Sequence, residues 1–483
     1  MVESTVSDAP PGTRPHRFGF ALALSVIAAC QLMMVLDNTV VTIALPRIQD
    51  GLGFSPTALS WVMNAYVVAF GGLMLLGGRT GDLLGRRPVF VVSVVAFTVA
   101  SLLCGIAADG AWLLAARTLQ GVAAAFASPA ALALIAGSFE GERRARALGV
   151  YAGVSSVGWA AGMILGGLFT SWLSWRWVFF VNLPVGAAIA LASPRVLPAP
   201  SRRPGRFDTA GALTSTLGCG ALVYALVRVA DRGWGDASAL AASAVAAVLL
   251  AAFVFAESRA SQPITPLRLF AGRTRTTALL ARMCVNGAMM GMFFYLTQVL
   301  QRVMGYSALR TGLAFVPIAV AMLVSTRVAP RLAARTGHRS PAVVAALALA
   351  GGMWWLGRLG PDSGYGAGIV VPLVLAGLGM GVAFVLLTAI ALDGVGAEDA
   401  GAASGLVTVS QQLGGALGMS VLVTAYGTAA RGTHGTEARV FLHGARSAFD
   451  TAAILCLLAA VAVLAGLRRT GDGRTTGGRR HER

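Results

Sequence analysis

The chain contains no lysine and carries little charge of either sign. All 38 of its basic residues are arginine, and charged residues make up 12% of its 483 positions, against 56% for hydrophobic residues. Without lysine it has neither the phosphate-binding loop of P-loop ATPases nor a lysine Schiff base. The high apolar content excludes a soluble enzyme, so we expect no catalytic residues, no ATP hydrolysis and no cofactor.

Cysteine and histidine are also scarce. The five cysteines stand singly in apolar runs without C-x-x-C spacing, and none of the five histidines has a ligand partner at helical spacing. We interpret the cysteines as small buried hydrophobic residues. We predict no metal site, because isolated histidines and cysteines do not form the ligand clusters that bind metals.

Long apolar runs make up most of the chain. A helix needs about 20 apolar residues to cross the hydrocarbon core of a bilayer, and charged or Pro- and Gly-rich breaks separate fourteen such runs. These runs predict an all-α integral membrane protein with fourteen transmembrane helices. Their approximate spans are residues 18–44, 57–78, 88–108, 111–136, 147–170, 175–193, 208–230, 238–257, 275–298, 309–329, 341–359, 367–392, 402–428 and 447–467. We expect the first run to be a retained helix, because it is too long for a cleaved signal peptide.

The arginines predict how these helices are oriented. With an even number of crossings both termini lie on one side of the membrane, and that side holds 26 arginines against 10 on the other. Because cytoplasmic loops of membrane proteins are enriched in arginine, we predict a multi-pass protein of the cytoplasmic (inner) membrane with both termini in the cytoplasm. The formal net charge of +18 is then mainly a signal of topology, and we expect no nucleic-acid binding, since the charge is dispersed over loops.

An internal repeat appears when the chain is shifted by 252 positions. The matched pairs include Gly53 with Gly305, Arg79 with Arg331, Gly85 with Gly337, Gly162 with Gly414 and Gly166 with Gly418. One shift without a gap indicates a duplicated six-helix bundle whose copies run in parallel, with the transport site expected between them near the bilayer midplane. The predicted parts are a cytoplasmic tail (1–17), an N-terminal six-helix bundle (18–193), two inserted helices (208–257), a C-terminal six-helix bundle (275–467) and a basic cytoplasmic tail (468–483).

The loop after the second predicted helix combines glycine, acid and arginine in the sequence G-G-R-T-G-D-L-L-G-R-R-P, residues 77–88. Gly85 lets two helix ends approach closely, and Asp82 is placed to pair with Arg86 or with a helix N-terminus. The run resembles the G-x-x-x-D-R-x-G-R-R signature of the major facilitator superfamily, with Leu83 in place of the usual arginine. That resemblance implies that Asp82, Gly85 and Arg86 form a latch between bundle helices that breaks and reforms during alternating access.

Three further stretches are similar to the fourteen-helix drug:proton antiporters of that superfamily. They are L-D-N-T-V-V at 36–41 with A-L-P at 44–46, R-T-L-Q-G at 117–121, and W-R-W-V-F-F-V-N-L-P-V-G at 175–186. The resemblance covers nearly the whole chain. It implies the major facilitator fold, with two six-helix bundles plus two inserted helices, and it implies that Arg117 takes part in proton coupling.

The fifth predicted helix is rich in glycine but departs from the antiporter motif of this family. Where the family has G-P-x-x-G-G, this chain reads G-M-I-L-G-G at 162–167, so Met163 replaces the proline. The glycines that remain permit close helix packing and bending. We interpret them either as plain packing residues or as part of the coupling machinery: Gly153, Gly158, Gly162, Gly166 and Gly167.

Asp37 is the one acidic residue well inside a predicted helix. Intramembrane acids are functional by default, so we expect Asp37 to take up a proton outside and release it inside. If the first helix ends near residue 45 and the fourth begins near 111, Asp37 and Arg117 lie about 12 and 9 Å deep in the outer half. We hypothesise that Arg117 sets the protonation balance of Asp37 in one conformation and releases it in the other.

Several polar residues interrupt otherwise apolar helices. Arg282 lies 7 residues past Arg275, so we expect its side chain to reach the cytoplasmic surface by snorkelling. The polar residues predicted to line a substrate cavity are Asn64, Tyr66, Asn286, Tyr295, Gln298 and Gln411. Flexible and aromatic side chains suit varied lipophilic ligands, and we add to this cavity Met289, Met290, Met292, Phe293 and Phe294.

These observations predict a secondary transporter that exports a drug or antibiotic-like amphiphile in exchange for protons. Its expected partners are a small amphiphilic substrate taken from the cytoplasm or inner leaflet, protons and the lipid bilayer, and we expect it to act as a monomer. One alternative is a proton-linked carrier of a metabolite such as an amino acid, which the direction of flux under a proton gradient distinguishes. The other is a non-transporting receptor or scaffold, against which the lack of a large extramembrane domain argues.

Overall fold

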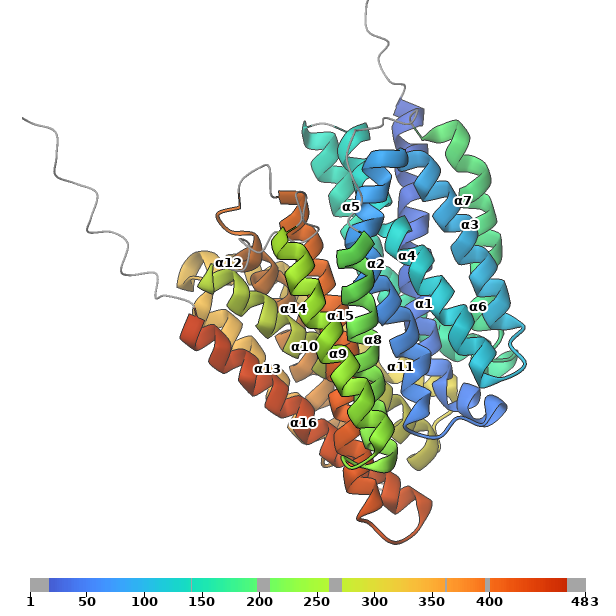
Figure 1. The fold of residues 1–483 in the computed structure, drawn as a ribbon. Helices are drawn as coiled ribbons and strands as arrows, with labels where there is room; N and C mark the ends of the chain where they lie inside the picture. Colours follow the sequence, from blue (N-terminus) through green and yellow to red (C-terminus); the bar gives the residue numbers. More distant parts are fainter. Residues whose placement is uncertain are drawn as a thin grey trace, which may run out of the picture.

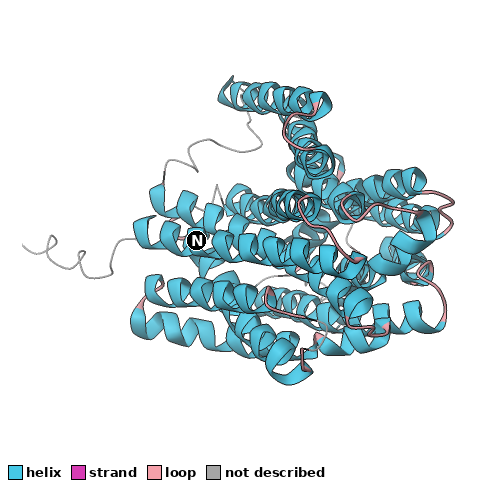
Figure 2. Ribbon diagram, turned by 90° about the horizontal axis from the view of Figure 1, so that it is seen from below, coloured by secondary structure: helices cyan, strands magenta, loops and turns pink. Residues whose placement is uncertain are grey.

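Helices account for all regular structure in the part of the chain that the computed structural model describes. The described residues are 17–139, 141–197, 209–259, 272–360, 363–395 and 400–466. No strand occurs among them (Figure 2), so the prediction of an all-helical membrane protein is confirmed. Apart from Arg17, the predicted tails 1–17 and 468–483 lie outside the described residues.

The helices fall into three consecutive groups along the chain. The first group is α1 (Arg17–Leu52), α2 (Trp61–Leu84), α3 (Arg86–Gly105), α4 (Gly110–Ser138), α5 (Gly141–Trp172), α6 (Trp177–Phe180) and α7 (Asn182–Val196). The second is α8 (Thr209–Arg232) and α9 (Ala237–Arg259). The third is α10 (Arg273–Gln298), α11 (Ala308–Ala314), α12 (Val316–Thr336), α13 (Arg339–Leu356), α14 (Val371–Leu392), α15 (Ala400–Arg431) and α16 (Glu437–Gly466), with short π-helical segments at Val299–Val303 and Tyr365–Val370.

Twelve helical spans in the described residues are long and apolar enough to cross a membrane. Two further predicted crossings coincide with α2 and α13, which are not among the twelve. The shorter apolar stretch Ala58–Met74 covers the turn before α2 and the first part of α2, and α13 is only 18 residues long and starts with Arg339. The predicted total of fourteen crossings is therefore not confirmed.

The first helix is longer than the sequence predicted. Instead of ending near residue 44, α1 continues through Pro46 to Leu52. Membrane helices tolerate a proline because neighbouring groups satisfy the backbone that it leaves unbonded. Asp37 consequently lies 15 residues, or about 22 Å, before the end of α1. The predicted end of the first helix is wrong, and Asp37 lies further from that end than the expected distance of about 12 Å. Its depth in the membrane stays a prediction.

The first and third groups pack as two halves that lie side by side, with α8 at their junction and α9 packed on α8 (Figure 1). Within the first half, α2 packs on α4 and α1 on α5, while α10 packs on both α15 and α16 in the third. The helix α8 is bonded to both halves: the Thr57 hydroxyl donates to the Asp231 carboxylate, and the Thr424 hydroxyl donates to the Leu226 carbonyl at 2.8 Å. The predicted limits of the bundles stay a prediction.

The two halves touch mainly on the side of the molecule where α1 ends. Four hydrogen bonds between described residues join them, and all lie toward that side. They link Asn64 to Ser420 (3.2 Å), Gln301 to the Ile43 carbonyl (2.9 Å), Arg302 to Asp50 (2.9 Å) and the Leu309 amide to Ser171 (3.0 Å). The structure is thus closed at the end of α1 that is remote from the N-terminus.

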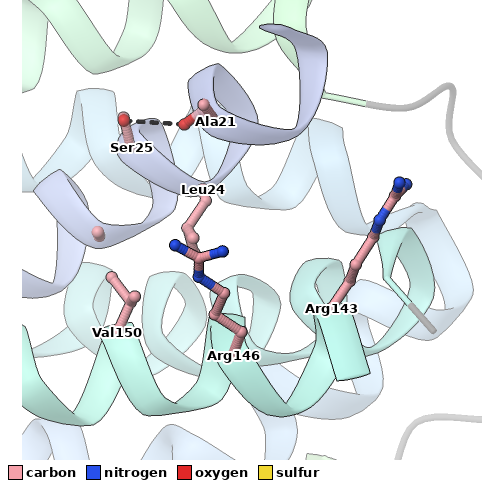
Figure 3. Close-up of a pocket in the computed structure, with 7 residues that line it drawn as sticks. Ala21, Leu24, Ser25, Arg143, Arg146 and Val150 are labelled. Atoms are coloured by element: carbon pink, nitrogen blue, oxygen red, sulfur yellow. Dashed lines mark hydrogen bonds between the residues drawn. The ribbon is translucent and has the colours of Figure 1, made fainter. Parts of the chain in front are cut away.

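A large cavity lies at the opposite end, between the first turns of α1 and α5. Its volume is about 730 Å³, and Figure 3 shows the side chains that line it. The α1 wall is mostly apolar, with Leu24 near its centre, while Arg146 reaches from α5 toward α1. Because α1 and α5 both belong to the first half, this cavity lies within that half and not between the two halves.

Candidate transport site

An ion pair is buried in the first half. Asp37 on α1 and Arg117 on α4 are both 0% exposed, and Nη1 of Arg117 lies 2.7 Å from Oδ2 of Asp37. The other carboxylate oxygen, Oδ1, accepts hydrogen bonds from Nε2 of Gln120 at 2.7 Å and from Nδ2 of Asn182 at 2.8 Å. Both acceptor atoms of the carboxylate are therefore satisfied without water.

The arginine is held by more than the carboxylate. Its Nε donates to the Val62 carbonyl at 3.0 Å, and its Nη1 also donates to Oε1 of Gln120 at 2.8 Å. The guanidinium lies over the Tyr66 ring, 4.5 Å from its centroid, which places a cation against the negative face of an aromatic ring. Its Nη2 is buried without a partner among the described residues.

Five helices, α1, α2, α3, α4 and α7, meet at this pair. Arg117 and Gln120 are three residues apart on α4 and so share one face of that helix. Asn182 begins α7, and Ser101 on α3 completes the set by accepting from Nε2 of Gln120 at 2.8 Å. The structure thus brings together the two residues predicted to couple protons, although they are 80 positions apart.

Sequence reasoning missed part of this network. Gln120 and Asn182 were in the quoted motifs R-T-L-Q-G and W-R-W-V-F-F-V-N-L-P-V-G, but neither was selected as a site residue. Their position inside those motifs was the available signal. Ser101 had no such signal, because a single serine in an apolar helix usually bonds its own backbone.

The chemistry of this arrangement follows from its charges. Removing water from two charges is costly, and only their mutual attraction and good hydrogen bonds repay that cost. A proton added to Asp37 removes the attraction and turns an acceptor oxygen into a donor. Protonation of the carboxylate would therefore weaken the contact between α1 and α4 that the pair makes.

The predicted latch lies at the junction of α2 and α3. The side chain of Asp82 is outside the described part of the structure. Gly85 joins the two helices with φ +102°, a conformation that favours glycine, and Nη1 of Arg86 donates to the Ala133 carbonyl on α4 at 2.9 Å. In this state Arg86 thus bonds within its own half, and the latch role stays a prediction.

The helix-five glycines bring two pairs of helices together. A Cβ on Gly158, Gly162 or Gly166 would approach α1 within 3 Å, for example 2.8 Å from Cβ of Thr39 at Gly162. On another face, a Cβ on Gly167 would lie 2.7 Å from the Ala308 carbonyl oxygen of α11, in the other half. Gly153 has nothing within 4 Å. Four of the five glycines therefore allow close packing, and one of these four does so between the halves.

A small cavity of about 40 Å³ lies between the halves, beside the ion pair. It is lined from the first half by Asn38, Thr39, Thr42, Leu45, Met63, Trp159 and Met163, and from the other by Met289, Met290, Phe293 and Phe294. Pockets for drug-sized ligands have volumes of about 300–1,000 Å³. This cavity is therefore too small to hold such a ligand in this state. Four of the five Met and Phe residues predicted to line a cavity do so here, whereas Met292 is buried at 0% exposure.

The six polar residues predicted for the cavity lie elsewhere in this state. Tyr66 supports Arg117, and Asn64 bonds Ser420 across the halves. The Tyr295 ring stacks on Tyr426 with centroids 5.3 Å apart, and Gln298 donates to the Phe294 carbonyl of its own helix at 3.3 Å. These four side chains are thus taken up by packing or by local hydrogen bonds.

The last two polar residues, Asn286 and Gln411, form a cluster with Arg282. The Asn286 amide donates to the Gln411 carbonyl at 2.6 Å, and Nη2 of Arg282 donates to Oε1 of Gln411 at 2.7 Å. Arg282 is 5% exposed and points between α14 and α15. The prediction that Arg282 snorkels to the surface is wrong, because its helix rotation turns the side chain inward.

Comparisons with known proteins agree with this geometry. The chain has the features of a multi-pass membrane transporter built from two packed helical halves. The model of the Major Facilitator Superfamily matches residues 27–419, and the chain belongs to that family.

Its relatives include proteins named for antibiotic export or resistance. It is 41% identical to the cephamycin export protein of Amycolatopsis lactamdurans, over 87% of each chain. It is 43% identical to the puromycin resistance protein of Streptomyces alboniger, over 86% of this chain and 83% of that protein. Among solved structures, a bacterial homologue of the human lysosomal transporter Spinster superposes with a TM-score of 0.67, at 17% identity, covering 94% of this chain and 98% of that one. That last likeness concerns the fold alone.

Proposed function

We propose that this chain exports antibiotics or similar amphiphiles across the cytoplasmic membrane in exchange for protons. The Asp37–Arg117 pair carries the proposal, since it places a fully buried carboxylate and its cation beside a cavity between the halves. Relatives at 34–43% identity that are named for export of or resistance to cephamycin, puromycin, tetracenomycin C and lincomycin support the class of cargo.

The helix α1 links the proton site to the cargo space. Asp37 belongs to the buried pair, while its neighbours Asn38 and Thr39 line the small cavity together with Met289 and Phe293 from the other half. A proton on Asp37 frees α1 from Arg117 and so changes the wall that the cargo contacts. Protonation from outside then favours release of cargo outward, and loss of the proton inside restores the closed pair.

The same proposal includes the orientation and the full helix count. The arginine-rich side that holds the termini would be cytoplasmic, so the 730 Å³ cavity opens inward. Helices α2 and α13 would complete fourteen crossings, because α2 has 24 residues and packs against α4 and α15, and α13 packs against α14 and α16. The chain would then be a fourteen-helix drug:proton antiporter that acts as a monomer.

Transport measurements in proteoliposomes test the proposal. Puromycin and a cephamycin are offered at the face equivalent to the cytoplasm, and uptake is compared with and without an imposed pH gradient. Wild-type protein should accumulate at least one of them against its gradient, and a protonophore should abolish the accumulation. Asp37→Asn should lose gradient-driven accumulation, whereas Asp450→Asn, on the remote surface of α16, should keep it.

Three results would contradict the proposal. Undiminished accumulation by Asp37→Asn would exclude Asp37 as the proton site. Flux in the uptake direction, or flux of amino acids but of no drug in a diverse panel, would favour a metabolite carrier. Absence of flux for every compound tested would favour a receptor or scaffold.

A further inference from the structure

A second buried arginine lies in the other half, and it has no acidic partner. Arg282 on α10 is 5% exposed, and no acidic side chain contacts it among the described residues. We propose that Arg282 binds the anionic head of a transported amphiphile, a carboxylate, sulfonate or phosphate. The inference rests on the proposed export function and specifies its substrate class.

The hydrogen bonds of Arg282 leave part of its guanidinium free. Its Nη1 donates to the Thr388 hydroxyl at 2.6 Å and to the Phe384 carbonyl at 3.3 Å, and its Nη2 donates to Oε1 of Gln411 at 2.7 Å. A guanidinium has five N–H donors, so these bonds use three. The Nε is buried without a partner, which leaves it and one Nη2 proton for an acceptor that the described protein residues do not supply.

All the observed partners of Arg282 are neutral. The Phe384 ring, 4.4 Å from the guanidinium carbon, and the oxygens of Thr388 and Gln411 lessen the cost of burial without cancelling the charge. Arg117 in the first half differs, because Asp37 balances it. An unbalanced charge inside a membrane protein is expensive and marks a functional site by default.

The internal repeat shows that the first half has no charged residue at the position equivalent to Arg282. Under the shift of 252 positions, Arg282 falls on Cys30 of α1, which is fully buried in the core of the first half. The position in the fold is thus filled by a small apolar residue in one copy and by a cation in the other. The charge is particular to the second half.

The position of Arg282 on α10 leads to the cargo space. Asn286, Met289 and Phe293 follow it at intervals of four, seven and eleven residues, which lie on one face of a helix. Met289 and Phe293 line the cavity between the halves, and Arg282 lies about 10 Å from Met289 along the axis, toward the start of α10. An amphiphile with its head at Arg282 would place its apolar body against these residues.

Binding of two dyes that share one apolar body tests this assignment. The anionic dye is 1-anilinonaphthalene-8-sulfonate, and the neutral one is N-phenyl-1-naphthylamine. Saturable binding to the purified full chain is measured in nanodiscs of phosphatidylcholine without any gradient. Arg282→Gln should weaken binding of the sulfonate dye about tenfold or more, because hydrogen bonds to a charged group are lost, and should leave the neutral dye unchanged. Arg358→Gln, at a surface arginine paired with Asp450, is the control and should change neither.

A second variant keeps the fold and tests the same idea from the opposite direction. Gln411→Glu places a carboxylate where an amide oxygen now lies 2.7 Å from Nη2 of Arg282. The new ion pair should raise the thermal unfolding temperature. Because the carboxylate then balances the charge of Arg282, binding of the sulfonate dye should weaken as strongly as it does in Arg282→Gln. A purely structural role for Arg282 gives higher stability with dye binding unchanged, and that result would overturn the assignment.

The outcomes separate this inference from the proposed function. If Arg282→Gln weakens binding of both dyes equally, or of neither, the anion site is refuted, while the proposal of proton-driven export is unaffected. Selective loss of the sulfonate dye in both variants supports the site even if Asp37→Asn still accumulates drug. Repeating the titration with phosphatidylglycerol in the nanodisc tells a lipid head from a soluble substrate, since only a lipid occupant competes with the dye.

Discussion

Charge removal at the buried pair should have unequal effects on the stability of the protein. Asp37→Asn leaves the Arg117 guanidinium buried without an anion, and arginine does not lose its proton inside proteins. Arg117→Gln leaves a carboxylate that can become neutral by taking up a proton and that retains Gln120 and Asn182 as donors. We therefore expect Asp37→Asn to be the more damaging of the two substitutions.

The size of the effect follows from the geometry. Two unit charges about 4 Å apart attract by about 4 kcal/mol at an effective dielectric constant of about 20, and removal of one member of a buried pair typically costs about 3–5 kcal/mol. We expect Asp37→Asn to lose about that much free energy of unfolding. We expect Arg117→Gln to lose less than about 3 kcal/mol, and the double variant to be more stable than Asp37→Asn alone, since it removes the orphaned charge.

Denaturant unfolding in mixed micelles, followed by tryptophan fluorescence, measures these differences. The matched control is Asp450→Asn, which breaks the half-exposed pair with Arg358 and should cost no more than about 1 kcal/mol. If Asp37→Asn costs no more than this control, or if Arg117→Gln is the costlier change, then the buried pair does not hold the energy that its geometry implies. The reasoning on protonation fails with it.

Three further outcomes follow from local geometry. Gly162→Ala should cost about 1–3 kcal/mol of unfolding free energy through overpacking against α1, whereas Gly153→Ala, with open space around it, should be neutral or stabilising by about 0.5–1 kcal/mol. Gly167→Val should push α5 from the backbone of the other half and increase labelling of cysteines introduced on the side where α1 ends. The hydrogen bond from the Ser238 hydroxyl, and after it the bond from the Ala239 amide at 3.0 Å, lower the pKa of Asp236. Asp236 therefore stabilises the start of α9 above the pKa that it has in the unfolded chain. This stabilisation is lost as the pH falls through the lower pKa of the folded state. The protection factor of the Ala239 amide, which is its exchange rate relative to the intrinsic rate at the same pH, should fall in acid in the wild type and should not change with pH in Asp236→Asn.

Each of these expectations has an outcome that contradicts it. Equal stability of the Gly162 and Gly153 variants would mean that α1 and α5 are not in close contact. Unchanged cysteine labelling in Gly167→Val would mean that α5 does not help to close this side. A protection factor at the Ala239 amide that stays the same in acid in the wild type would mean that Asp236 does not bond it.

The buried network shows where sequence reasoning reached and where it stopped. Asp37 and Arg117 could be selected because charges are rare in apolar helices, and a charge there needs a reason. Gln120 and Asn182 could not be ranked above other amides, because their partner is reached only when α1, α4 and α7 pack together. The end of the first helix was also misplaced, since α1 continues past Pro46 to Leu52.

The sequence by itself determined the helices, the membrane and the candidate proton pair. Long apolar runs must become helices because a bilayer offers no water to unpaired backbone groups. Only the tertiary structure decided which side is closed and where polar side chains point. Arg282 illustrates the difference: its distance from the helix end suits either a surface position or an inward one, and packing against α14 and α15 turned it inward. Contacts between residues far apart in the chain depend on helix rotation and on the meeting of the two halves, which local sequence does not encode.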